Sequence, residues 1–172
     1  MRDLSEARHL ATHDSLTGLP NRVLLLDRLG QALARATRYR EGVMLLVVDL
    51  DAFKLVNDTY GHGVGDEILR QVAARLLACV RACDTVCRYG GDEFVVLLPQ
   101  IDAVGDAEVV CGKIRARLAA PYALGDQPIL ATASFGAAVY RGNGQSSGEL
   151  INRADAAMYV EKIRRKSSAP DA

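Results

Sequence analysis

The stretch Arg88-Tyr89-Gly90-Gly91-Asp92-Glu93-Phe94-Val95-Val96-Leu97-Leu98-Pro99 decides the fold of this chain. Two glycines between strand-like runs are typical of a tight β-hairpin, because a type I′ turn needs positive φ at both central residues. Two carboxylates follow the glycines, although acids repel each other and are poor strand formers. A divalent metal ion that carries phosphate is the natural partner for such a tip. Taken alone, the tip is equally well a solvated acidic turn.

Composition bounds the class of protein. The chain has 172 residues, enough for one domain with a buried core, and its 21 Lys and Arg balance its 21 Asp and Glu. Zero net charge argues against a general nucleic-acid-binding protein but allows a small nucleotide bound with metal. The apolar runs are too short to cross a bilayer, no secretory signal is found, and the cysteines lack a CxxC pair. We therefore expect a cytoplasmic domain without membrane contact of its own, whatever anchors the full-length protein.

Hydrophobic periodicity predicts alternating helices and strands. We expect helices at about 22–40, 53–58, 66–80, 103–119 and 147–162, and strands at about 43–49, 85–89, 93–98 and 129–140. The last strand is either continuous or in two pieces that join near Gly136. Three glycines between the second and third helices are expected to form a flexible link: Gly61, Gly63 and Gly65. The order of elements predicts an α/β (α+β) fold with a mixed, mainly antiparallel central sheet flanked by helices.

Local signals set the boundaries of the domain. Residues 1–12 are polar and weakly periodic, and we interpret them as the remnant of a stalk or linker. Asn21 is expected to cap the first helix, and the sequence 146–149 offers a capping box for the last. The residues 167–172 are expected to form a disordered tail, which leaves 13–166 as the functional domain.

A second acidic site follows the predicted strand 43–49, where Asp49 is the last residue. Ligands in α/β folds gather at strand ends. If this strand lies beside the hairpin, Asp49 converges with Asp92 and Glu93. Converging carboxylates suit nucleotidyl transfer with two metal ions, one activating the attacking hydroxyl and the other steadying the leaving phosphate. Taken alone, Asp49 is more simply a turn acid that ends a strand.

Several segments lie in the order and spacing of a known family. They are Asp14-Ser15-Leu16-Thr17-Gly18-Leu19-Pro20-Asn21-Arg22, Asp49-Leu50-Asp51-Ala52-Phe53-Lys54-Leu55-Val56-Asn57-Asp58, Gly61-His62, Gly65-Asp66, Arg88-Tyr89-Gly90-Gly91-Asp92-Glu93-Phe94, Ser134-Phe135-Gly136 and Ala154-Asp155-Ala156-Ala157-Met158-Tyr159. With them the chain resembles the GGDEF domain family of diguanylate cyclases over about 13–162. The resemblance implies condensation of two GTP molecules into cyclic di-GMP with release of two pyrophosphates. It also implies a sheet core like that of nucleotidyl cyclases and polymerase palm domains.

The resemblance implies a metal site. By family position, Asp49, Asp92 and Glu93 hold two divalent ions per GTP, Mg²⁺ or Mn²⁺, with help from the Leu50 carbonyl. Which of Asp92 and Glu93 assists deprotonation of the 3′-hydroxyl stays open. Neighbours in a regular strand point to opposite faces, so both acids reach one metal pair only if the turn distorts the start of the strand.

Two further positions match family residues that recognise guanine. The Asp66 carboxylate would accept from N1–H and N2–H₂, and the Asn57 amide would pair with N2–H and N3. Adenine would leave Asp66 unpaired, which argues against an adenylyl-type cyclase on the same core. Without the resemblance, Asn57 is a candidate helix C-cap and Asp66 a candidate N-cap.

Basic residues match family positions near the triphosphate: Lys54, Arg88 and Lys162. Backbone N–H groups around Phe53 add further donors. The sequence departs from the family pattern from Glu161 on, since Glu161 stands where the family has an alanine. Lys166 stands where the family has an arginine and lacks its bidentate fork, and the family glycine before it is missing.

An Arg-x-x-Asp motif precedes the hairpin. Arg81 lies nine positions before Gly90, the family spacing for a product-inhibition site, and Asp84 completes the motif. An arginine can hold a guanine or a phosphate, and a carboxylate can accept from guanine. Arg88 and Lys113 are further expected contacts, with Arg115 beside them. A solvated helix end is the alternative.

The resemblance makes one chain half of an active site, because two chains with one GTP each must face each other antiparallel. We expect a homodimer, with the dimerising element in an upstream sensor domain or coiled coil. The isolated chain would then be a weak cyclase limited by encounter between two copies. The alternative function is a catalytically weak regulatory module that binds GTP or cyclic di-GMP.

Overall fold

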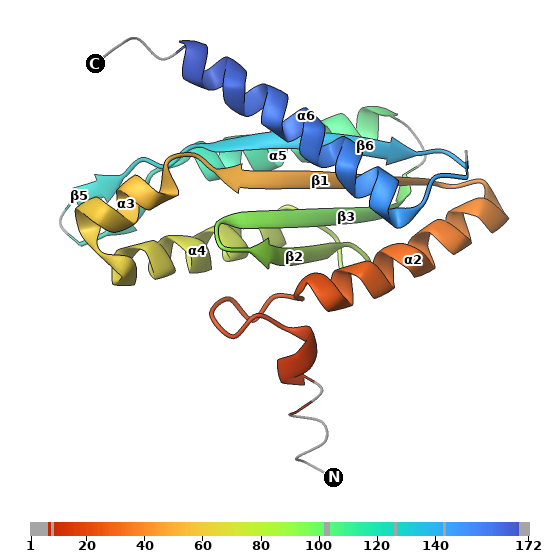
Figure 1. Cartoon of the computed structure of the whole chain (residues 1–172), viewed down its shortest axis with the longest axis horizontal. Coiled ribbons are helices and arrows are strands. Elements are labelled where there is room, and N and C mark those ends of the chain that lie inside the picture. Colours follow the sequence, from red (N-terminus) through yellow and green to blue (C-terminus); the bar gives the residue numbers. More distant parts are fainter. Residues whose placement is uncertain (1–6, 8, 102–103, 126, 143, 169–172) are drawn as a thin grey trace.

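A computed structural model describes residues 7, 9–101, 104–125, 127–142 and 144–168. Helices lie on both faces of a central sheet, and the last helix extends past the edge of the sheet (Figure 1). The elements are α2 (Arg22–Tyr39), β1 (Gly42–Leu50), α3 (Phe53–Tyr60), α4 (His62–Leu77), β2 (Thr85–Gly90), β3 (Glu93–Ile101), α5 (Val104–Ala119), β4 (Tyr122–Leu124), β5 (Gln127–Ile129), β6 (Ala133–Tyr140) and α6 (Ser147–Ser168). None of the described helices is both long and apolar enough to cross a membrane.

The four-stranded sheet has the order β2-β3-β1-β6, and each of these three pairings is antiparallel. Strands β4 and β5 form a separate two-stranded hairpin. The predicted α+β fold with a mainly antiparallel central sheet flanked by helices is confirmed, and the three pairings of this sheet are all antiparallel rather than mixed.

Alternation along β1 separates two cores. One series of β1 side chains packs with α2 and α6, and the other packs with α4 and α5. The first series is Val43, Leu45 and Val47, and the second is Met44, Leu46, Val48 and Leu50. This double burial explains the unbroken apolar run, because both faces of a central strand need apolar side chains. Asp49 continues the first series and therefore faces α6.

Both predicted helix caps are confirmed. The Asn21 side chain accepts the backbone N–H groups of Val23 and Leu24 at 2.9 and 3.2 Å. Ser146 and Glu149 form the reciprocal capping box, with N···O distances of 2.7 and 3.2 Å. Helix α6 continues to Ser168, so the first two residues of the predicted tail are helical, and 169–172 lie outside the described residues.

The predicted glycine link is wrong. Helix α4 begins at His62 and includes Gly63 and Gly65, so only Gly61, with φ of 88°, separates it from α3. A Cβ at position 65 would lie 1.8 Å from Oδ1 of Asn57. Gly65 therefore serves the close approach of α3 to α4 rather than flexibility.

Residues 129–140 form neither one continuous strand nor two pieces that join near Gly136, so both expectations for this stretch are wrong. Gly136 lies inside β6, and residues 130–132 separate β6 from β5. A Cβ at position 136 would lie 2.1 Å from both the Ala154 carbonyl oxygen and the Met158 amide nitrogen. The glycine lets the backbone of α6 rest directly on β6, and this contact fixes the height of α6 above the sheet.

The hairpin exists, but not as a type I′ turn centred on two glycines. Gly90 ends β2, Gly91 and Asp92 form the two-residue loop, and neither glycine has φ in the left-handed region. The register shifts between Arg88 and Gly90. This bulge moves the turn by one residue, and the Arg88 guanidinium donates to the Gly91 carbonyl at 3.0 and 2.8 Å.

Gly136→Ala should destabilise the protein by about 3 kcal/mol or more, because the added methyl would force the backbone of α6 away from β6. Gly112→Ala in α5 is the matched control, since a Cβ there meets nothing within 4 Å. It should be neutral or stabilise by up to about 1 kcal/mol. Urea unfolding followed by circular dichroism measures both, and equal stabilities would contradict the described docking of α6.

Candidate active site

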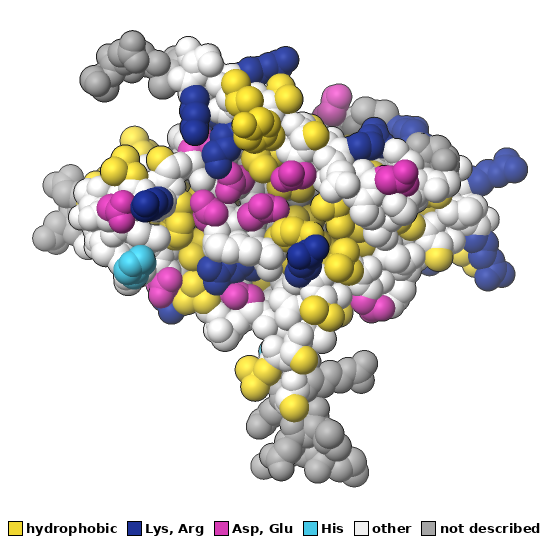
Figure 2. Space-filling view, in the orientation of Figure 1, with side chains coloured by type: hydrophobic (Ala, Val, Ile, Leu, Met, Phe, Trp, Pro, Cys, Tyr) yellow, Lys and Arg dark blue, Asp and Glu magenta, His cyan; other side chains and the backbone are white. Residues whose placement is uncertain are grey.

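The ends of β1 and β3 bring the predicted acids together. Asp49 pairs with Glu93 in the register of β1 and β3, so their side chains share the face that α6 covers. The Leu50 N–H donates to the Asp92 carbonyl at 3.2 Å, which pins the hairpin tip to the end of β1. Asp49 is buried, whereas Asp92 and Glu93 are half-buried. Figure 2 shows acidic side chains gathered near the centre of this face, with basic side chains beside them.

Helix α6 supplies cations to these acids. The Lys162 ammonium donates to the Asp49 carboxylate. Arg165 lies 3.5 Å from the carboxylate of Asp51, which also accepts from the hydroxyls of two residues at 2.7 and 2.6 Å, Thr132 and Ser134. Lys166, which the sequence favoured, is exposed. Helix geometry alone does not distinguish Arg165 from Lys166, because residues three and four positions after Lys162 both lie beside it on the helix. The sequence therefore does not single out Arg165.

The carboxylates at this end repel one another. Burial raises the pKa of Asp49, and the charge of Asp92 adds to the rise while Lys162 opposes it. Burial likewise raises the pKa of Glu93, and neighbouring acids add to it, led by Asp155 of α6. The hydrogen bond to Asp49 raises the pKa of Lys162. The sequence alone assigns Asp155 no role at this site, because only the fold brings α6 over β3.

The donors fit a hard divalent cation. Carboxylate and carbonyl oxygens are the ligands that Mg²⁺ takes, and Asp49, Asp92, Glu93 and the Leu50 carbonyl offer them. Their mutual repulsion is the kind that a bound cation relieves. In the part of the chain that the structure describes, no three His, Cys, Asp or Glu side chains are gathered closely enough to hold a metal ion. Lys162 instead supplies the positive charge at Asp49.

The helices α3 and α4 present the predicted base-recognition residues. Asn57 lies inside α3 and its Oδ1 is buried with no hydrogen-bond partner, so it is not the C-cap, which is Gly61. Asp66 lies inside α4, half-buried, and is not an N-cap. Phe53 packs against the core, and Lys54 on the same helix is exposed. A buried amide oxygen without a donor is costly, so Asn57 Oδ1 keeps an unused capacity to accept a hydrogen bond.

Arg88 braces the tip. Its guanidinium binds both carboxylate oxygens of Asp14 at 3.0 and 3.2 Å as well as the Gly91 carbonyl. Burial opposes the charge of Asp14, yet hydrogen bonds from Thr17 and Arg88 hold the pKa of its carboxyl below the usual value. The sequence placed Arg88 beside the triphosphate and in the inhibitory site. Its hydrogen bonds instead tie the loop that begins at Asp14 to the hairpin.

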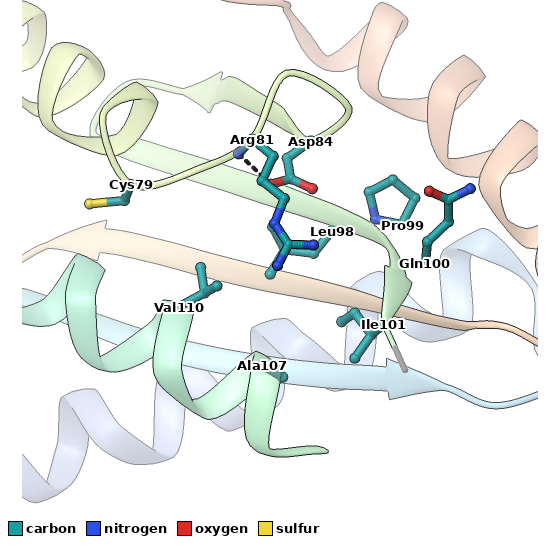
Figure 3. A pocket seen from close by; sticks show the side chains of 9 residues that line it. All are labelled: Cys79, Arg81, Asp84, Leu98, Pro99, Gln100, Ile101, Ala107 and Val110. Atoms are coloured by element: carbon teal, nitrogen blue, oxygen red, sulfur yellow. Dashed lines mark hydrogen bonds between the residues drawn. The ribbon is translucent and has the colours of Figure 1, made fainter. Parts of the chain in front are cut away.

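The Arg-x-x-Asp motif folds into a turn between α4 and β2. The Arg81 N–H donates to the Asp84 carboxylate at 2.6 Å, and the Asp84 N–H donates to the Arg81 carbonyl at 3.1 Å. Figure 3 shows the Arg81 side chain extending into a pocket against β3 and α5. Cys79, Arg81, Asp84, Leu98, Pro99, Gln100, Ile101, Ala107 and Val110 line this pocket.

The two cations expected beside this motif lie elsewhere on α5. Lys113 is exposed and is not among the residues that line the pocket. Arg115 forms a bidentate pair with Glu161 of α6 at 2.7 and 2.9 Å, and its guanidinium lies 4.3 Å from the centre of the Phe135 ring. Its contacts join α5 to α6 and β6 rather than to the pocket.

Residues 11–168 match the family model described as diguanylate cyclase, GGDEF domain. The chain belongs to this family. It is 48% identical over 91% of its length to the bifunctional diguanylate cyclase/cyclic di-GMP phosphodiesterase MucR of Pseudomonas aeruginosa, of which it spans only 23%. The matched part is therefore only a fraction of that relative's length.

Solved GGDEF domains share the fold. A truncated TpbB from Pseudomonas aeruginosa that comprises only the GGDEF domain matches with a TM-score of 0.85 and 39% identity, over 88% of this chain and 89% of that one. The coiled coil and GGDEF domain of DgcB from Caulobacter crescentus, in complex with cyclic di-GMP, matches with a TM-score of 0.87 and 32% identity, over 95% of this chain and 86% of that one.

Glu93→Gln should stabilise the ligand-free protein by about 1 kcal/mol at pH 7, because it removes a carboxylate that its surroundings disfavour. A carboxyl whose pKa is raised on folding costs stability above its folded pKa. This cost disappears below the pKa of a Glu carboxyl in the unfolded chain, about 4.3. The added stability of Glu93→Gln should therefore vanish by about pH 4. Urea unfolding from pH 4 to 8 measures it.

Glu67→Gln is the control, since Glu67 forms only an exposed pair with Arg70 at 3.3 Å. This control should change the stability by less than about 0.5 kcal/mol across the same pH range. Destabilisation of Glu93→Gln at pH 7 would contradict the described crowding of carboxylates.

Proposed function

We propose that this GGDEF domain is a diguanylate cyclase that condenses two GTP molecules into cyclic di-GMP and two pyrophosphates. The observation that carries the proposal is the placement of Asp49 opposite Glu93, with Asp92 pinned beside them. Asp49 and Glu93 lie at the ends of paired strands and Asp92 lies in the loop between the hairpin strands. In a domain of this family, we infer that these acids complete a metal site together with the phosphates of a bound nucleotide.

In this proposal, separate sets of residues bind the metal ions and the triphosphate. Asp49, Asp92, Glu93 and the Leu50 carbonyl hold two divalent ions per GTP, Mg²⁺ or Mn²⁺. Such ions, when bound, lower the pKa of the attacking 3′-hydroxyl and stabilise the leaving pyrophosphate. The basic residues Lys54, Lys162, Arg165 and Lys166 neutralise the triphosphate. The glycines of the tip leave open space where a Cβ would stand, so phosphate oxygens can approach the backbone.

Guanine selection rests on α3 and α4. The unpaired Oδ1 of Asn57 accepts from an exocyclic N–H, and Asp66 accepts from the Watson–Crick edge. An adenine base would leave the half-buried Asp66 carboxylate facing an acceptor at N1, and two acceptors that face each other without a proton between them are unfavourable. The pair therefore favours GTP over ATP.

The reaction needs a second copy of the chain. One domain carries one set of acids, whereas cyclic di-GMP contains two phosphodiester bonds, so two domains face each other with one GTP each. The solved DgcB relative comprises a coiled coil and a GGDEF domain, which supports a dimerising segment, expected upstream, here as well. In this proposal, cyclic di-GMP is both product and inhibitor.

A direct test incubates the domain, fused behind a leucine zipper, with GTP and Mg²⁺ and measures cyclic di-GMP by chromatography. The fusion should form product, and the unfused chain should have a specific activity that rises with protein concentration. Asn57→Ala should lower kcat/KM for GTP by about tenfold or more. Asn152→Ala, the same change on the exposed surface of α6, should not. GTP binding without product would instead favour a regulatory module.

Product inhibition has its own test. Arg81→Ala should raise the concentration of cyclic di-GMP that halves the initial rate by about tenfold or more, since a charge-assisted contact in the pocket is lost. Arg70→Ala removes the same charge from α4 and serves as the control. If added cyclic di-GMP inhibits both variants equally, this pocket is not the inhibitory site.

A further inference from the structure

Lys162 stands where a bound cation would stand. Its ammonium donates to the Asp49 carboxylate, the most buried acid of the site. The charges of Asp92 and Asp51 also lie near enough to favour the protonated lysine. In the ligand-free protein, this one side chain therefore supplies charge to the carboxylates that would hold metal.

An ammonium and a divalent ion held by the same carboxylate repel each other, because both are positive and lie at close range. Binding of a metal ion at Asp49 therefore weakens the contact with Lys162 and favours its displacement. Displacement costs the ion pair and leaves an ammonium beside a doubly charged ion. A metal ion without a counter-anion binds against this cost, whereas a polyphosphate offers the displaced ammonium a new partner.

Helix α6 is anchored on both sides of Lys162, so the lysine can change partner by side-chain rotation alone. One residue before it, Glu161 holds Arg115 of α5 in a bidentate pair. Three residues after it, Arg165 approaches Asp51 at 3.5 Å. The same anchoring gives a role to Glu161, one of the residues by which this chain departs from the family pattern.

We propose that Lys162 couples metal binding to nucleotide binding by acting as a removable counter-cation for Asp49. In the free protein it keeps divalent ions out of the site. When a nucleoside triphosphate enters, the ammonium transfers from Asp49 to a phosphate and the metal ion takes its place. The inference rests on the proposed function for the identity of the nucleotide, but the exchange at Asp49 is measurable without turnover.

The test measures Mn²⁺ binding to the nucleotide-free full chain by electron paramagnetic resonance of the free ion. Lys162→Met should bind Mn²⁺ on the order of five- to tenfold more tightly than the unmodified chain, the factor expected for release of a partly buried ion pair. Lys162→Gln, which can still hydrogen-bond Asp49, should show the same direction. Arg70→Met removes an equal charge from α4 and should leave the affinity within twofold.

The tighter Mn²⁺ binding of Lys162→Met depends on Asp49, so adding Asp49→Asn to this variant should abolish the increase in affinity. Adding 3′-deoxy-GTP, which lacks the nucleophile and cannot react, should tighten Mn²⁺ binding to the unmodified chain severalfold more than to Lys162→Met. Unchanged or weaker Mn²⁺ binding by both Lys162 variants, or equal effects of 3′-deoxy-GTP on all proteins, would overturn the proposal. A separate assay of cyclic di-GMP formation distinguishes failure of the proposed exchange at Asp49 from failure of the cyclase assignment.

Discussion

The register between β1 and β3 is the constraint on which the rest of the site depends. Both faces of β1 are buried, so a slip by one residue would turn its apolar side chains to the wrong core and is strongly disfavoured. The register that satisfies both cores also sets Asp49 opposite Glu93, on the face toward α6. The packing of the sheet therefore positions the acids, and no special loop is needed to bring them together.

The same constraint explains why α6 carries cations. Acids held together by the fold repel one another, and burial disfavours their charged forms. Gly136 lets α6 lie directly on β6, close enough for Lys162 and Arg165 to reach the acids at the end of the sheet. In the free protein, Lys162 and Arg165 thus offset part of the negative charge at this end of the sheet.

Much of the fold was predictable from local signals, because caps, periodicity and apolar runs act within a few residues. The helix caps at Asn21 and Ser146 and the hairpin strands are examples. The errors arose where a distant partner decides the conformation. The turn at Gly91 depends on Arg88, whose other partner Asp14 lies 74 positions away. Gly65 looked like a flexible residue until Asn57 was seen against it.

A crystal structure of the dimerised domain with Mn²⁺ and 3′-deoxy-GTP, with the metal located by anomalous scattering, would show which side chains hold the metal ion. We expect Mn²⁺ bound by Asp49 and by at least one acid of the hairpin tip. We also expect guanine against Asn57 and Asp66, and Lys162 released from Asp49. Nucleotide bound with the Lys162–Asp49 pair intact, or Mn²⁺ away from β1 and the tip, would contradict these expectations.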